Sequence, residues 1–288
     1  MIRFSRKEDE TQIKRLWIQA FGDSPQATDF YFDNRYEEEN LLIDTEDGQL
    51  RGMLSMLPIQ LLMGGQSYNA RYFFAIATDA ANKRQGISSR LIQSAKTLTK
   101  QQGGIAAVLV PANADLFHFY GKRGFETAFY YDLLKAQAKG LPSCPADTQF
   151  IPADAASMLR LRDKSQADSR LYVRWDEKAL RFIIKASRAW ESPLLFFGSG
   201  GGEGYAYCEW DEDTLMVKEL VLQGIEVTTA LAILHSRLQA KHYVLRLPQN
   251  AAPSSGDVLP ACPYGMISWL ADKPPAGGTA PYLGFGKD

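Results

Sequence analysis

The chain has 288 residues, of which 45% are hydrophobic and 23% charged, and its formal net charge is −1. At roughly 150 residues per domain, this length predicts two domains with a core each. The composition is typical of a soluble globular protein. A net charge near zero gives no electrostatic reason to expect nucleic acid or an anionic membrane as a partner. No stretch has the length and hydrophobicity of a membrane span, and no apolar signal region opens the chain.

The cysteines and histidines predict neither a disulfide framework nor a metal site. Cys144, Cys208 and Cys262 are odd in number, lie far apart and form no Cys-x-x-Cys pair. The three histidines form no ligand cluster with them. Reduced thiols in a cytoplasmic protein are the simplest interpretation.

Hydrophobic periodicity predicts alternating strands and helices in the first half of the chain. In chain order we expect a strand at 2–5, a helix at 9–21, a helical or irregular stretch near 30–36, strands at 41–44 and 51–57, a strand pair at 59–62 and 68–78, a helix after Gly86, a strand at 105–110 and a strand at 129–134. Residues 136–147 contain Gly140, Pro142 and Pro145 and predict a linker.

The second half repeats this order in outline. We expect a strand near 150, helices at 155–162 and 176–189, a hairpin of strands at 194–197 and 205–210, a strand at 215–222, a helix opened by Gly224 and a strand at 242–247. The glycine-rich stretch 198–204 precedes a strand rather than a helix, which favours a flexible hairpin over a phosphate-binding loop.

Residues 73–126 hold the most informative pattern. An apolar run at 74–78 predicts a strand, and the basic turn at 83–88, which contains Gly86, precedes a helical pattern. A second strand leads to Asn113 and then to Tyr120. Free N–H groups and the positive dipole end at a helix start favour a pyrophosphate. The pattern indicates a site for a phosphorylated carrier and an acyl transfer.

These residues resemble the GNAT superfamily of acetyl-CoA-dependent N-acyltransferases. Its first motif, [Arg/Gln]-x-x-Gly-x-[Gly/Ala], follows a strand and opens a helix. Lys83, Gly86 and Ser88 hold its fixed positions, with conservative departures at Lys83 and Ser88. Its second motif places an Asn after the next strand, a Tyr seven residues on and then a Gly-Phe pair. Asn113 and Tyr120, followed by such a pair, match this register.

A longer resemblance covers most of the chain. Residues 76–86, with Trp17 and the stretch 20–22, are similar to the enhanced-intracellular-survival type of acetyltransferase. That type has two tandem GNAT folds followed by a sterol-carrier-like domain. The resemblance implies an α/β fold with mixed sheets: a catalytic domain at 1–135, the linker at 136–147 and a degenerate GNAT-like domain at 148–288, without the third domain.

The resemblance also implies a mechanism, in which an acetyl group passes from acetyl-CoA to a primary amine by direct attack in a ternary complex. The implied carrier-binding residues are Ile76, Ala77, Thr78, Lys83, Arg84, Gln85, Gly86, Ile87, Ser88, Ser89 and Asn113. A backbone N–H near Ile76 or Ala77 would polarise the thioester carbonyl, and Tyr120 would donate a proton to the departing thiolate, with no metal. Water, His118, an acidic residue and the Asp288 carboxylate stay open as the base.

The second unit is expected to lack a carrier site, because Glu226 stands where the first unit has the basic turn. That unit would wall the substrate cleft or hold a homo-oligomer.

The acceptor is expected to be a small-molecule or peptide amine. Two other functions are open. The first is transfer of an aminoacyl or another acyl group by an enzyme of tandem GNAT type; the aminoacyl-tRNA-dependent form would need a basic groove for tRNA, which the net charge does not favour. A non-catalytic acetyl-CoA sensor would keep the carrier site alone.

Overall fold

The computed structural model describes residues 1–253 and 257–286. The first unit consists of β1 (Ile2–Phe4), α1 (Glu10–Phe21), α2 (Pro25–Asn34), β2 (Leu41–Glu46), β3 (Gln49–Met63), β4 (Gln66–Thr78), α3 (Ile87–Gln101), β5 (Ala106–Leu109), α4 (Ala114–Gly121) and β6 (Glu126–Gln137), with short 3-10 turns at Lys7–Asp9, Glu38–Asn40 and Ala80–Asn82.

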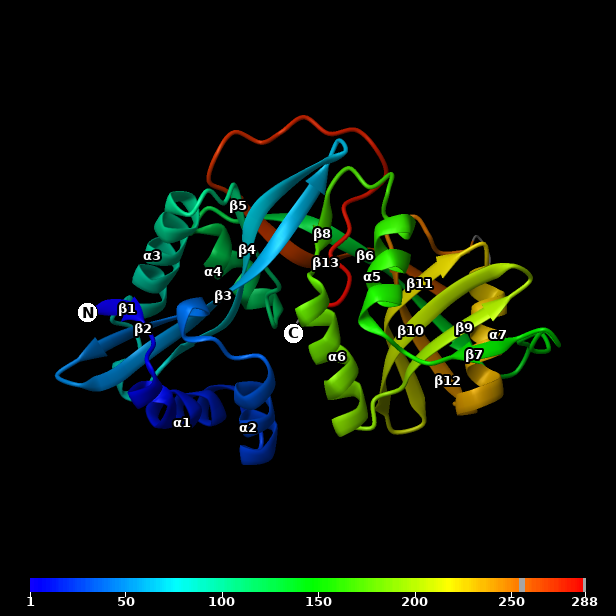
Figure 1. The fold of residues 1–288 in the computed structure, drawn as a ribbon, viewed down its shortest axis with the longest axis horizontal. Helices are drawn as coiled ribbons and strands as arrows, with labels where there is room; N and C mark the ends of the chain where they lie inside the picture. Colours follow the sequence, from blue (N-terminus) through cyan, green and yellow to red (C-terminus); the bar gives the residue numbers. More distant parts are fainter. Residues whose placement is uncertain (254–256, 287–288) are drawn as a thin grey trace.

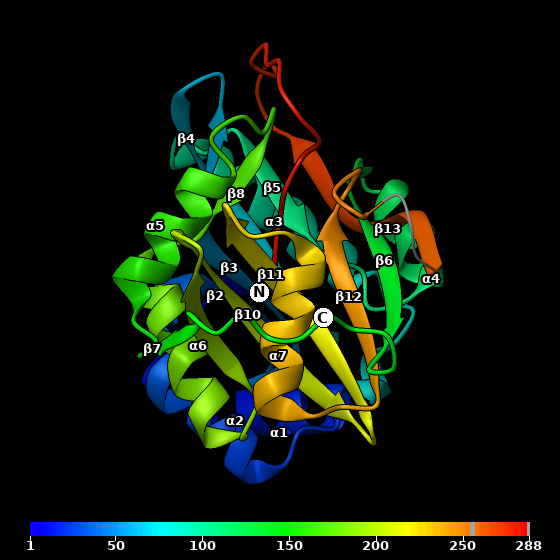
Figure 2. The ribbon, with the colours of Figure 1, turned by 90° about the vertical axis from the view of Figure 1, so that its right-hand side faces the viewer.

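The second unit repeats most of this order. It consists of β7 (Gln149–Ile151), α5 (Ala155–Ser165), β8 (Tyr172–Arg174), α6 (Glu177–Ala189), β9 (Leu194–Ser199), β10 (Gly202–Asp211), β11 (Thr214–Gln223), α7 (Val227–Leu238), β12 (His242–Pro248) and β13 (Asp257–Trp269). Helices α5 and α6 lie on the opposite face of its sheet from α7 (Figures 1 and 2).

The expected α/β fold with a mixed sheet is confirmed. Two boundaries predicted from the sequence are wrong. Strand β3 continues through Pro58, which pairs with Arg71 of β4, where a break was expected. Strand β6 reaches Gln137, so the connection to the second unit begins later than residue 136. The division into two domains stays a prediction.

The helices of the first unit follow from local signals. Helix α1 buries Ile13, Leu16 and Trp17 and ends at Gly22, whose φ of 72° is the left-handed conformation that glycine adopts readily. Helix α2 begins after Ser24, whose side chain accepts a hydrogen bond from the Ala27 N–H.

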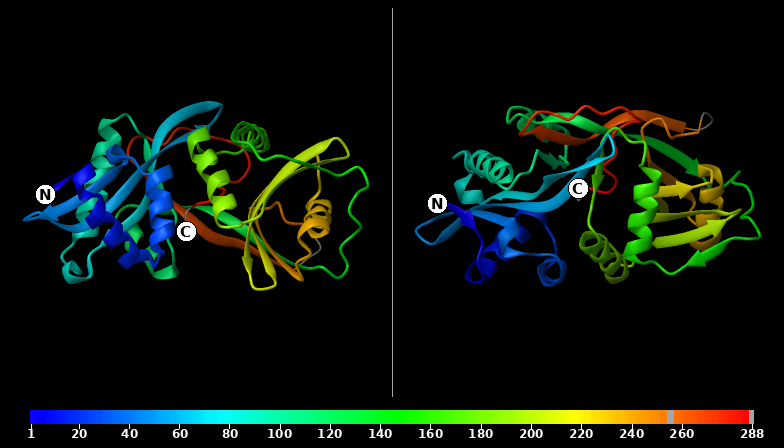
Figure 3. Two further views of the ribbon diagram at one scale, coloured as in Figure 1. Left: turned by 60° about the horizontal axis from the view of Figure 1, so that its bottom comes forward. Right: turned by 45° about the horizontal axis from the view of Figure 1, so that its top comes forward.

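In the part of the chain that the structure describes, strand pairing joins the units into one sheet of 13 strands. Its order is β1-β2-β3-β4-β5-β13-β6-β12-β11-β10-β9-β7, with β8 paired to β3. Strand β13, from the end of the chain, lies between β5 and β6, while β6 pairs with both β13 and β12. Figure 3 shows β6 and β13 running from one unit to the other. Each unit therefore completes its sheet with a strand from the other.

The two units also pack through aromatic side chains. Phe30 of α2 lies 5.8 Å from Phe182 and 5.7 Å from Trp190, measured between ring centroids. Phe182 belongs to α6, which therefore faces α2 across the gap between the units.

Three further observations concern the part of the chain that the structure describes. No helix there is long and apolar enough to cross a membrane. No group of three or more His, Cys, Asp or Glu side chains there could hold a metal ion. The three cysteines are free thiols.

Candidate functional site

The basic turn lies at the N-terminus of α3, as the motif predicts. Gly86 is the N-cap residue of this 15-residue helix, with a φ of 74°, and Arg84 has a φ of 65°. Two left-handed residues on either side of Gln85 make a tight turn that aims the first N–H groups of α3 outward. These N–H groups have no acceptor within the helix, so they are available to an anion.

A cleft opens in front of this turn. Its lining includes seven of the predicted carrier-binding residues: Thr78, Lys83, Arg84, Gly86, Ile87, Ser88 and Ser89. Among the described residues that line it there is no carboxylate, whereas three are cationic. The cleft therefore combines a helix N-terminus with positive charge, which suits a phosphorylated ligand.

Arg123 is the third cation of the cleft, and the sequence reasoning missed it. Its guanidinium donates two hydrogen bonds to the Ser89 hydroxyl, at 3.0 and 2.6 Å, and lies 3.4 Å from the centroid of the Phe119 ring. These contacts fix the charge beside the first turn of α3. The signal was present, because Arg123 directly precedes the Gly-Phe pair of the second motif.

Strand β4 diverges from β5 beside this cleft. The two strands pair in parallel only as far as Tyr72 and Val108. Further along β4, its register with β3 shifts by one residue between Phe74 and Ala77, and Ala75 has a φ of 50°. A bulge of this kind leaves a backbone group of the strand without a ladder partner. Left-handed backbone at a non-glycine residue is uncommon and concentrates at functional sites.

The other predicted residues are distributed around this divergence. Ala77 is buried and pairs with Met53, and Ile76 is half-buried on the same strand. Asn113 is the N-cap of α4, where its side chain accepts a hydrogen bond from the Leu116 N–H. It lines a second hollow, with Val110 at the end of β5, rather than the cleft at the turn.

Tyr120 lies in the last turn of α4 and is 8% exposed. Its ring packs edge-on against Phe119 and Phe125. Burial raises the pKa of its hydroxyl to about 12, despite the opposing charge of Arg123. The hydroxyl therefore keeps its proton at physiological pH, so that it can donate a proton or a hydrogen bond there but is not present as a tyrosinate base. His118 is exposed on the same helix.

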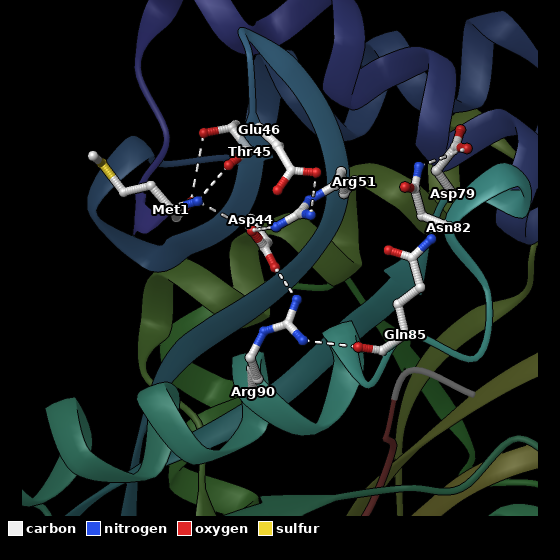
Figure 4. Close-up of polar contacts among 9 residues, drawn as sticks. All are labelled: Met1, Asp44, Thr45, Glu46, Arg51, Asp79, Asn82, Gln85 and Arg90. Atoms are coloured by element: carbon white, nitrogen blue, oxygen red, sulfur yellow. Dashed lines mark hydrogen bonds and ion pairs between the residues drawn. The ribbon is translucent and has the colours of Figure 1, made fainter.

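A buried carboxylate braces the basic turn from behind. Asp44 of β2 is 1% exposed and accepts hydrogen bonds from Arg51 at 2.8 Å and Arg90 at 3.0 Å. Arg90 also donates to the backbone carbonyl of Gln85 at 2.8 Å, so that the pair links the sheet to the turn (Figure 4). The Met1 amino group lies 3.4 Å from the same carboxylate. No sequence motif singled out Asp44 or Arg90, because a residue 46 positions away cannot be paired by spacing alone.

A further pocket lies between the two units. The first unit contributes Trp17, Phe30 and Phe74, the second contributes Phe182, Trp190 and Tyr207, and Phe285 and Gly286 follow from the C-terminal segment. Asp23, Glu209, Lys218 and Arg246 supply polar groups. Phe74 lies next to the bulge in β4, so one end of this pocket meets the diverging strands. Residues of both units thus line this pocket, and whether it is the substrate cleft expected from the sequence stays a prediction.

We expect Asp44→Asn to destabilise the protein in a pH-dependent way. Burial raises the pKa of the Asp44 carboxyl, but the hydrogen bonds from Arg51 and Arg90 outweigh it, so the net pKa is lowered from 3.8. A carboxyl whose pKa is lower in the folded protein than in the unfolded chain stabilises the fold at pH values above its unfolded pKa. This stabilisation is lost as the pH falls below about 4. Because Arg90 is half exposed, the free energy of unfolding of Asp44→Asn at pH 7 should be lower than that of the wild type by about 3 kcal/mol, the low end for breaking a buried ion pair.

Urea unfolding of both proteins at pH 7 and at pH 3 measures this difference. The matched control is Glu46→Gln, which removes the exposed partner of the same Arg51 and should change stability little. A gap between the wild type and Asp44→Asn that is as large at pH 3 as at pH 7 would contradict the assignment.

Comparison with known proteins places the first unit in a family. Residues 1–128 match the family model described as Acetyltransferase (GNAT) domain. No curated protein matches the sequence.

Solved structures match across both units. A GCN5-related N-acetyltransferase from Anabaena variabilis has a TM-score of 0.78 at 16% identity, covering 94% of this chain and 73% of that one. A protein from Enterococcus faecalis, described as a probable N-acyltransferase, has a TM-score of 0.76 at 16% identity over 94% and 72%. Eis1 from Mycobacterium abscessus has a TM-score of 0.69 at 15% identity over 94% and 74%.

At these identities the structural matches show the shared fold, over the length of both units, and the family assignment comes from the sequence match. Residues 1–128 therefore match a GNAT acetyltransferase domain, and this match supports an acyltransferase.

Proposed function

We propose that this protein transfers an acetyl group from acetyl-CoA to a primary amine, by direct attack of the amine on the thioester. One observation carries the proposal: the cationic cleft at the N-terminus of α3 adjoins the point where β4 diverges from β5. The cleft suits the pyrophosphate of the carrier, and the diverging strand offers backbone groups to the pantetheine arm.

The carrier would be held mainly by backbone. N–H groups of residues 84–88 would donate to the pyrophosphate, with Lys83, Arg84 and Arg123 supplying charge. The backbone of Ile76 and Thr78 would pair with the pantetheine as an added strand would. Asn113, at the start of α4, would contact the carrier from the end of β5.

The bulge gives the thioester a donor. A backbone N–H at Ile76, which has no register partner in β3, or at Ala77 beside it, would donate to the carbonyl oxygen as negative charge develops on it. Holding such a group fixed before the reaction removes the cost of reorienting it, which is where donors of this kind gain their effect.

The chemical step exchanges one bond for another. The amine nitrogen forms a bond to the acetyl carbon, the bond from that carbon to sulfur breaks, and Tyr120 gives its proton to the departing thiolate. The proton lost by the amine leaves with the base, for which the candidates named from the sequence stay open. The acceptor would approach through the pocket between the units, whose aromatic walls suit a partly apolar amine.

We expect Gly86→Val to weaken coenzyme A binding about tenfold or more, a loss of about 1.4 kcal/mol. A side chain there would hold the phosphates off the turn, and the φ of 74° adds strain of about 1–2 kcal/mol to the folded state. Calorimetric titration with coenzyme A measures the affinity.

The matched control is Gly48→Val. Gly48 has a φ of 76° and no atom within 4 Å of an added Cβ, and it lies in the turn between β2 and β3. It should lose comparable stability and keep its coenzyme A affinity. Equal affinity losses in the two variants would remove the turn at Gly86 from the site.

Tyr120→Phe should lower kcat about 10²-fold, the low end for general acid catalysis, since a thiolate is a fair leaving group. The ring and its packing remain, so the affinity for coenzyme A should not change. Steady-state assays with an amine panel and thiol detection give both constants. Because the pKa of Tyr120 is about 12, the wild-type rate should not fall on account of this group between pH 7 and 10. A loss carried wholly by KM would indicate a binding role instead.

A further inference from the structure

The second unit holds a buried ion pair that the proposed chemistry does not use. Arg162 of α5 is 0% exposed and Glu219 of β11 is 2% exposed, and the two side chains form a salt bridge. Tyr205 donates a hydrogen bond to one carboxylate oxygen at 2.6 Å, and Tyr282 donates to the other at the same distance. The pair therefore accepts one bond from the sheet of its own unit and one from the C-terminal segment.

Burying this pair is costly. A buried ion pair is often no more stabilising than apolar residues of the same volume. Within the described residues, Nε of Arg162 and the hydroxyl of Tyr172 beside it are buried without a hydrogen-bond partner, and each such group costs about 1–3 kcal/mol. Fold stability alone therefore does not account for this buried ion pair. The contacts of the pair are consistent with a different role, which is to fix the position of another element.

The element that the pair contacts is the C-terminal segment, residues 279–286. Besides Tyr282, the Leu283 carbonyl accepts a hydrogen bond from Arg162 at 3.5 Å. Gly284 passes so close that a Cβ there would lie 2.2 Å from Oε1 of Glu219 and 2.8 Å from the Arg162 guanidinium. The close approach leaves no room for a side chain, and the φ of 74° is a backbone conformation that glycine adopts more readily than other residues, so this position favours glycine.

Beyond this crossing, the segment enters the region of the proposed reaction. Phe285 lies with its ring centroid 4.7 Å from the Arg162 guanidinium carbon and lines the pocket between the units. The next N–H, of Gly286, donates to the Tyr264 hydroxyl at 2.6 Å. A Cβ on Gly286 would meet Val110 at 2.6 Å and the Tyr72 hydroxyl at 2.9 Å, which are residues at the point where β4 and β5 diverge.

We propose that Arg162 and Glu219 are positioning residues that hold residues 282–286 in place, so that Phe285 closes the inner end of the acceptor pocket and determines which amines it admits. This inference rests on the proposed function. It assigns a task to the second unit, which lacks a basic turn of its own: it supplies the wall against which the acceptor is selected.

Direct removal of Arg162 or Glu219 would leave an unpaired buried charge and risks unfolding, so the test uses the two tyrosines. Tyr282→Phe and Tyr205→Phe each remove one 2.6 Å hydrogen bond to the same carboxylate. Only Tyr282 belongs to the C-terminal segment, which makes Tyr205→Phe the matched control for a purely structural effect.

Hydrogen–deuterium exchange of the amides in 279–286 is the first readout. We expect the exchange rate there to rise about tenfold in Tyr282→Phe, which corresponds to the loss of a hydrogen bond that contributes about 1.4 kcal/mol. The rate should change much less in Tyr205→Phe. In Tyr282→Phe the KM for the acceptor should also rise, while kcat and the affinity for coenzyme A stay unchanged. Equal increases of exchange in both variants would overturn the proposal that Arg162 and Glu219 hold residues 282–286 in place.

Phe285→Ala tests the selecting wall. The ratio of KM for a bulky primary amine to KM for a small one should fall at least tenfold, because the truncation enlarges the pocket, while coenzyme A still binds as in the wild type. Phe285→Leu should restore part of the original preference. An unchanged ratio in a folded Phe285→Ala protein would overturn the role of Phe285. If the wild type acetylates no amine at all, the proposed function fails, and the exchange comparison still decides whether the pair holds the segment.

Discussion

The structure depends on one constraint: neither unit can close its sheet alone. Strand β13 lies between β5 and β6, and β6 in turn carries the pairing into β12 of the second unit. Backbone groups of a buried strand must find partners, so removing β13 would leave the edges of β5 and β6 that face it unpaired. This sharing of strands holds the second unit against the first. The same arrangement brings α2 and α6 together, where their aromatic side chains make contact.

This constraint explains how two units of similar fold can make one reaction centre. The cationic cleft belongs to the first unit, where α3 begins after a basic turn braced by Arg90 and Asp44. The pocket that adjoins the diverging strands takes its walls from both units and from the C-terminal segment. Under the proposed function, the cleft would hold the carrier, and the acceptor would have to be held at one distance and angle from the thioester. The second unit would meet that need as a fixed wall, without a carrier site of its own.

Sequence reasoning found what local patterns encode. The strand at 74–78, the glycine turn and α3 follow from periodicity and turn chemistry, and Lys83, Gly86 and Ser88 line the cleft that the motif predicts. It missed what only the fold brings together. Asp44 and Arg90 come from separate elements, and β13 pairs with strands more than a hundred residues earlier in the chain. Separate strands were expected at 51–57 and 59–62, yet β3 continues through Pro58 between them.

If the proposed function holds, only the first unit binds the carrier. Calorimetric titration of the full chain with coenzyme A measures the number of sites directly. We expect one site per chain, because the turn before α3 carries Lys83 and Arg84 whereas Glu226 is the N-cap residue of α7. Two equivalent sites per chain would contradict the division of labour between the units, and an absence of binding would remove the carrier site itself.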